Sequence, residues 1–153
     1  MKKLAGILIS LLLPIASTNA QELPGEASTF IAPFEAIKLA ADDPVNGVVG
    51  VFEFEVRGSG RDKKFVYLNS EMDYRDQRCL TVRMTRGNAA ALKKRLGLSP
   101  REELIGKRIR VHGTARRQQI VITNSGRRTG LYYYQTHIYV DDPNKIELLG
   151  GGA

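Results

Sequence analysis

An alternation of apolar and polar side chains near the middle of the chain is the strictest constraint on its fold. In residues 108–116, one set of alternate positions holds Ile109, Val111 and Gly113, and the positions between them are polar: Arg108, Arg110, His112, Thr114 and Arg116. Successive side chains of a β-strand point to opposite faces of a sheet, so this period of two predicts a strand with one buried and one exposed face. We therefore expect a sheet whose exposed face carries arginines.

Further strands are predicted where the same period recurs or where turn residues bound a short apolar run. They cover residues 48–56, 64–69, 79–84, 119–123 and 131–140, with a short apolar piece at 146–149. Gly50, inside the first of these strands, predicts a bulge or a sharp bend. Many short strands joined by glycine-rich turns favour a small barrel over a two-sheet sandwich, so the predicted fold class is mainly β.

Two short helices are also predicted. Residues 34–40, between Pro33 and Pro44, suit one or two helical turns. The second helix begins with Asn88 as its N-cap and ends at Gly97, which suits a left-handed C-terminal position. This second helix falls between the third and fourth predicted strands.

The segment from Gly106 to Ala115, with the sequence GKRIRVHGTA, resembles the fourth-strand signature of the OB-fold family. Residues 65–69 and 80–82 are similar to the second and third strands of bacterial OB-like domains. The resemblance covers residues 47–149 and implies a five-stranded OB-type barrel with one short helix between strands three and four. It also implies a binding face, but no particular ligand, because the family covers oligonucleotide, oligosaccharide and protein ligands.

The N-terminal residues have the three-part pattern of a secretory signal peptide. Lys2 and Lys3 precede an apolar stretch at 4–15, and small residues follow up to Ala20. The stretch is short for a retained membrane anchor, which is the alternative. We expect cleavage near Ala20, export to the periplasm or the exterior, and no transmembrane span after cleavage. The predicted units are a signal peptide at 1–20, a lead-in with a short helix at 21–46, the OB-fold domain at 47–149 and a tail at 150–153.

Basic residues are concentrated in the middle of the chain. The formal net charge is +7, and residues 57–128 hold 19 basic against six acidic side chains, whereas residues 21–56 hold one against seven. Cations beside aromatic rings on a strand face suit single-stranded nucleic acid, although a solvated strand face would have the same pattern. The candidate ligand-binding residues are Tyr67, Arg83, Arg108, Arg110, His112, Arg116, Arg127 and Arg128.

Three consecutive tyrosines at 132–134 divide between the two faces of their strand. Tyr132 and Tyr134 share one face, and Tyr133 shares the other with Gln135 and His137. Core or edge packing explains them without a ligand, and a stacking platform for bases or carbohydrate is the alternative.

No motif predicts catalysis, a cofactor or a bound metal. The lone cysteine, Cys79, lies in a strand pattern, so burial is expected, with a nucleophile or an intermolecular disulfide as alternatives. Glu71, Asp73 and Asp76 suit a polar loop better than a cation site, because their spacing matches no calcium-binding loop. Zinc binding by Cys79 with both histidines would need three strands to converge, without the short ligand spacing of a zinc site.

The sequence thus predicts an exported, non-catalytic binding protein for an acidic or polymeric ligand, either single-stranded nucleic acid or anionic polysaccharide. One alternative is a periplasmic protein-interaction or stress-related adaptor that binds another envelope protein. The other alternative is a metal-assisted nuclease of the staphylococcal type that uses Asp73 or Asp76.

Overall fold

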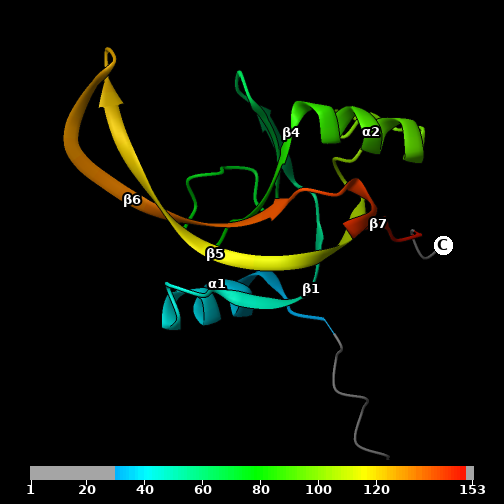
Figure 1. Ribbon diagram of the computed structural model, residues 1–153, viewed down its shortest axis with the longest axis horizontal. Coiled ribbons are helices and arrows are strands. Elements are labelled where there is room, and N and C mark those ends of the chain that lie inside the picture. The colour runs from blue at the N-terminus through cyan, green and yellow to red at the C-terminus, as the bar shows by residue number, and fades with distance from the viewer. Residues whose placement is uncertain (1–29, 151–153) are drawn as a thin grey trace, which may run out of the picture.

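A computed structural model describes residues 30–150, which form a mainly β protein with two α-helices (Figure 1). The predicted signal peptide, the first part of the lead-in and the last three residues lie outside the described residues. The helices are α1 (Pro33–Asp42), α2 (Arg86–Leu96) and the 3₁₀ helix η1 (Pro143–Lys145). The strands are β1 (Val48–Glu55), β2 (Gly58–Arg61), β3 (Phe65–Asn69), β4 (Leu80–Thr85), β5 (Arg108–Asn124), β6 (Arg127–Val140) and β7 (Ile146–Leu148).

All seven strands belong to one sheet with the order β1-β5-β6-β4-β3-β2, and β7 pairs with β5. The neighbours β4 and β6 are parallel, and the other pairs are antiparallel. The predicted closed barrel of five strands is therefore wrong, because the sheet is open and has more strands. Residues 58–61, between the first two predicted strands, form the additional strand β2. Backbone pairing changes just before it, because the N–H of Val56 donates to the Lys107 carbonyl whereas the N–H of Arg57 donates to the Asn69 carbonyl.

The strand β5 is longer than either pattern that predicts it. Residues 108–116 and 119–123 join into one strand of 17 residues, which pairs with β1 and β7 along its first half and with β6 along its second half. The second half forms a hairpin with β6, and this hairpin curves away from the rest of the sheet in yellow and orange (Figure 1). The alternation of residue types in the sequence predicts each half as a strand, but it does not predict that the two halves form one continuous strand.

The side of the sheet opposite the polar residues packs into the core. Ile109 and Val111 of β5 are fully buried, as the alternation predicts. Val66 and Leu68 of β3 are also buried, so that Phe65 and Tyr67 point to the other face. Helix α1 covers part of the sheet from below in Figure 1, with Ala36 and Ala40 wholly buried, and it contacts β1 and β5.

Two local predictions are wrong for identifiable reasons. No bulge occurs at Gly50, because β1 pairs with β5 without a register shift; a Cβ there would lie 2.6 Å from Cδ1 at the end of the Ile31 side chain. Helix α2 starts earlier than predicted, since Thr85 Oγ1 accepts the Asn88 backbone N–H at 3.1 Å. The helix ends at Gly97 in the left-handed conformation, which confirms the predicted C-terminus. No helix within residues 30–150 is long and apolar enough to cross a membrane.

Candidate ligand-binding groove

A hollow of about 530 Å³ lies on the polar face of the sheet, and we call it the central groove. Strands β3, β4 and β6 supply its floor, and β2, one residue of β5 and the loop at 70–79 supply its walls. Its lining residues are Ser59, Gly60, Arg61, Tyr67, Asn69, Met72, Tyr74, Thr81, Arg83, Ile120, Tyr133, Gln135 and His137. These described residues include two arginines and no carboxylate, so the hollow attracts anions.

Strand register explains how the floor is assembled. Thr81 of β4 lies between Asn69 of β3 and His137 of β6, and the Thr81 hydroxyl donates to Asn69 Oδ1 at 3.0 Å. Two residues along the strand, Arg83 lies between Tyr67 and Tyr139. Because side chains two apart share a face, the floor consists of a polar row beside a row of arginine and tyrosines.

Arg83 is held by aromatic rings instead of by a carboxylate. Its guanidinium carbon lies 4.8 Å from the centre of the Phe65 ring and 5.2 Å from the centre of the Tyr139 ring. Within residues 30–150, Arg83 forms no ion pair, and its buried Nε has no hydrogen-bond partner. Cation–π contacts hold the guanidinium in place without neutralising its charge, which leaves it available to an anion.

The hydroxyl of Tyr67 is anchored at the edge of the groove. It donates to Asp62 Oδ2 at 2.7 Å, and the other oxygen of Asp62 accepts the backbone N–H groups of Lys64 and Phe65 at 2.7 Å each. Burial, followed by the hydrogen bond to Asp62, raises the pKa of Tyr67 to about 12, so the phenol stays protonated at neutral pH. Asp62 thus fixes both the turn before β3 and the orientation of the ring.

His137 is a buried neutral histidine in the groove floor. Its side chain is 7% exposed, and burial, with the nearby charge of Arg83, lowers its pKa to about 4. Its Nε2 lies 2.8 Å from Gln135 Oε1, and the amide nitrogen of Gln135 donates to the Tyr74 carbonyl at 2.8 Å. This chain of contacts connects the floor on β6 to the loop wall.

A second hollow continues along the same face past Arg83 and His137, which line both. It also contains Arg116 of β5 and Tyr139 of β6, and its one carboxylate, Asp141, is paired with Lys145 at 2.7 Å. Arg116 is exposed and carries no ion pair within the described chain. The two hollows together form a continuous basic track across β3, β4, β6 and β5.

Three predicted binding residues on β5 lie outside both hollows and contact carboxylates of the same sheet. Arg110 donates through Nε to Glu53 Oε1 at 2.6 Å, and its Nη1 lies 3.4 Å from Glu147. Arg108 lies 3.9 Å from the same Glu53, and His112 Nε2 lies 3.2 Å from Glu147. We call these five residues the paired cluster; they bind one another instead of presenting an open cationic face.

The last two predicted residues, Arg127 and Arg128, lie at the tip of the β5–β6 hairpin. Arg127 pairs with Asn124 across the turn residues Ser125 and Gly126, both of which have positive φ. Both arginines are exposed and without an ion pair in the part of the chain that the structure describes. The hairpin tip is therefore basic, but it is separate from the groove lining.

Several groove residues are absent from the predicted binding set. The shared face of Tyr133, Gln135 and His137 is visible in the alternation of β6, so the sequence holds a signal for them. Arg61 and Tyr74 lie in segments for which no strand or helix is predicted, and no local pattern marks them. Only the pairing of β2 with β3 and the fold of the loop bring these two residues to the groove.

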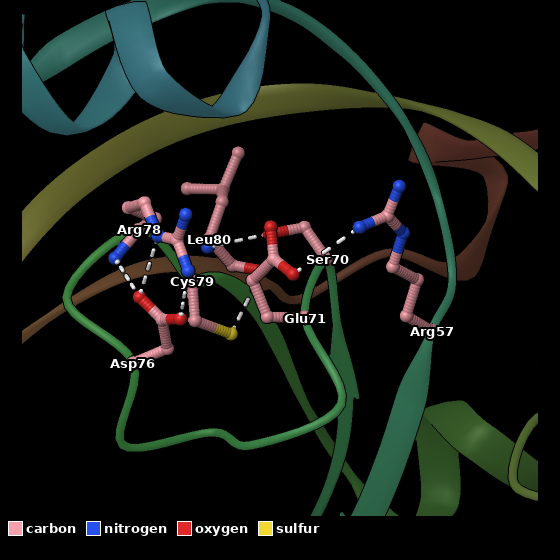
Figure 2. Close-up of polar contacts among 7 residues, drawn as sticks. All are labelled: Arg57, Ser70, Glu71, Asp76, Arg78, Cys79 and Leu80. Carbon is pink, nitrogen blue, oxygen red and sulfur yellow. Dashed lines mark hydrogen bonds and ion pairs between the residues drawn. The ribbon is translucent and has the colours of Figure 1, made fainter.

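Arginines engage the carboxylates of the loop at 70–79 (Figure 2). Arg57 pairs with Glu71 at 3.3 Å, and Arg78 pairs with Asp76 at 2.7 Å, which lowers the pKa of Asp76 to about 2. Cys79 is 2% exposed, so its predicted burial is confirmed, and burial raises the pKa of the thiol. Among residues 30–150, no three His, Cys, Asp or Glu side chains are grouped so that they would hold a metal ion.

No protein-family model and no curated protein matches this chain. Its class is therefore defined by its own architecture: an open, seven-stranded β-sheet protein with one covered face and one grooved, basic face. The groove combines unpaired arginines, aromatic rings and buried polar side chains. Such a combination forms a candidate binding site for an anionic ligand.

Proposed function

We propose that this protein is a non-catalytic binding module for single-stranded nucleic acid, which it binds in the central groove. The observation that carries the proposal is Arg83: a cation without a carboxylate partner in the described chain, held between two aromatic rings in a groove whose lining has no acidic residue. An unneutralised guanidinium among aromatic rings suits a nucleic acid strand, because it pairs with phosphate oxygens and also hydrogen-bonds to bases or stacks on them.

The tyrosines of the groove supply the second part of single-strand recognition. Tyr67, Tyr74 and Tyr133 line the hollow from three different segments, and Tyr139 lines its continuation. Bases of a single strand stack on such rings, and each stacked base contributes about 1–3 kcal/mol. We favour nucleic acid over anionic polysaccharide because several tyrosines beside unpaired arginines suit the stacked bases and phosphates of one strand.

The chain order supports kinship with the OB-fold family, which remains a proposal. Strands β1 to β4 precede helix α2 and strands β5 to β7 follow it, and the groove lies partly on β3 and β4, which would correspond to the second and third strands of that family. OB-folds bind single strands on this face. We also propose export after cleavage near Ala20, which N-terminal sequencing of the protein from an envelope fraction would test.

One observation favours the alternative of a protein-binding adaptor. The β5–β6 hairpin exposes apolar side chains beyond the sheet, with Leu131 64% and Tyr132 53% exposed. Exposed apolar side chains on a projecting hairpin are typical of a protein interface. Pull-down from an envelope extract, with and without nuclease treatment, separates the two functions, since a protein partner survives the nuclease.

Fluorescence anisotropy with a labelled oligothymidylate of about 16 nucleotides tests the main proposal. Binding should weaken strongly between about 50 and 200 mM NaCl, because each phosphate contact releases counterions. The matched control is the Lys93→Gln/Lys94→Gln variant, which removes two exposed charges from α2, outside both hollows, and should bind almost as well as the wild type. Absence of binding at low salt, or binding that does not depend on salt, contradicts the proposal.

A further inference from the structure

Two unpartnered polar atoms lie at the point where the two hollows meet. His137 Nδ1 and Arg83 Nε are both buried, and neither has a hydrogen-bond partner among the described residues. Both side chains line the central groove and its continuation. A buried polar atom without a partner costs about 1–3 kcal/mol, so such a pair in a ligand groove indicates groups that a ligand satisfies.

The hydrogen bonds around His137 determine which kind of group Nδ1 is. The Tyr74 carbonyl can only accept, so the Gln135 atom 2.8 Å from it is the amide nitrogen. Gln135 Oε1 is then the atom that lies against His137 Nε2 at 2.8 Å, and an oxygen acceptor requires Nε2 to carry the proton. In a neutral imidazole the other nitrogen is then a bare lone pair, so Nδ1 is an acceptor.

His137 therefore holds an unsatisfied acceptor, and Arg83, which lines both hollows with it, holds an unsatisfied donor, its Nε–H. A phosphate group offers only acceptor oxygens at neutral pH and would place them against the lone pair of Nδ1. The edge of a nucleobase offers an N–H donor beside an acceptor, as thymine does with N3–H and O4. The floor is thus complementary to a base edge and not to a phosphate.

We propose, building on the function proposed above, that bases enter the groove floor at Arg83 and His137 while the phosphates stay at the rim. The rim supplies suitable cations, because Arg61 and Arg116 are both exposed and lie at the two ends of the track. The aromatic rings also support this orientation of the strand. The centre of the Tyr67 ring lies 6.3 Å from the centre of the His137 ring, so a base that reaches the floor lies beside an aromatic surface. The ligand is then a nucleic acid strand bound with its bases inward.

An abasic oligonucleotide of equal length tests this inference, because it keeps the phosphates and lacks the bases. The wild type should bind oligothymidylate about tenfold or more tightly than the abasic strand. The His137→Leu variant should lose most of that preference while its affinity for the abasic strand stays unchanged. His137→Asn, which keeps an acceptor near the position of Nδ1, should recover part of it.

A measurement on the wild type keeps the inference testable if His137→Leu fails to fold. The ¹⁵N resonance of His137 Nδ1 should shift when oligothymidylate is added and stay in place with the abasic strand. Equal, salt-dependent binding of both strands and no such shift would overturn the inward orientation of the bases and leave the proposed function standing. Binding of neither strand would contradict the proposed function itself.

Discussion

The molecule carries two groups of basic side chains on one face of the same sheet, and they differ in what surrounds them. In the paired cluster, Arg110 faces Glu53 on the neighbouring strand β1 and Glu147 on β7. In the central groove, Arg83 faces Tyr67 and Tyr139 on its neighbouring strands. The same residue type on the same face is thus part of the sheet's own structure at one place and open to a ligand at the other.

This difference shows that residues on the neighbouring strands determine whether the charge of an arginine is neutralised. Glu53 is 7% exposed, and a carboxylate that is this deeply buried requires its cationic partner. Arg110 therefore stabilises the sheet and offers little charge to a ligand. Arg83 has aromatic neighbours, which position its charge and leave it free to attract an anion.

The largest effect on ligand binding is expected in the groove. Arg83→Gln combined with Arg116→Gln should weaken binding of oligothymidylate about tenfold or more and flatten its dependence on log salt by about 0.7 for each phosphate that the variant no longer neutralises. Anisotropy titrations at several salt concentrations measure both changes, with the Lys93→Gln/Lys94→Gln variant as the control of equal charge. An equally large weakening in the control would show that net charge, and not the groove, carries the binding.

A large effect of pH on stability is expected from His137, the groove's buried histidine. Its folded pKa of about 4 lies below the usual 6.5, so the unfolded chain binds the proton more readily. The stability that this group contributes is complete above pH 6.5 and is lost as the pH falls towards 4, by about 2 kcal/mol between pH 7 and pH 4.5. Urea unfolding at both pH values should show a smaller change in His137→Gln than in the wild type.

Disrupting the paired cluster should lower the stability of the fold and strengthen binding of the oligonucleotide. In Glu53→Gln, Arg108 and Arg110 lose their buried counter-charge, so the urea midpoint should fall while the freed arginines strengthen salt-dependent binding of oligothymidylate severalfold. Glu55→Gln, on the same strand but exposed and outside the paired cluster, is the matched control. A Glu53→Gln protein with unchanged midpoint and unchanged binding would remove the distinction between the two groups of basic residues.

The smallest effect is expected at the hairpin tip. Arg127→Gln with Arg128→Gln should weaken binding of the oligonucleotide by about threefold or less, because these exposed residues act through long-range attraction that salt screens. The same titrations measure it. A weakening as large as that of the groove variant would extend the binding site along the hairpin.

Much of the fold was predictable because it depends on local periodicity. The alternation in 108–116 identifies Ile109 and Val111 as core residues, and the C-terminus of α2 at Gly97 follows from the one residue that adopts positive φ without strain. The strand β2 escapes prediction because a segment of glycine, serine and arginine has no apolar period; only its pairing with β3 makes it a strand. The predicted five-stranded barrel fails for the same reason, since pairing partners are not encoded in periodicity.

What the sequence determined by itself was which side chains share a face, because that depends only on the geometry of a single strand. It placed Tyr67, Arg83 and Arg116 on the polar face and Cys79 in the core. The tertiary structure alone decided which cations are neutralised, because Glu53 lies 57 residues before Arg110 in the chain and opposes it only through the pairing of β1 with β5. A charge is free or paired according to its neighbours in space, and those are set by strand register.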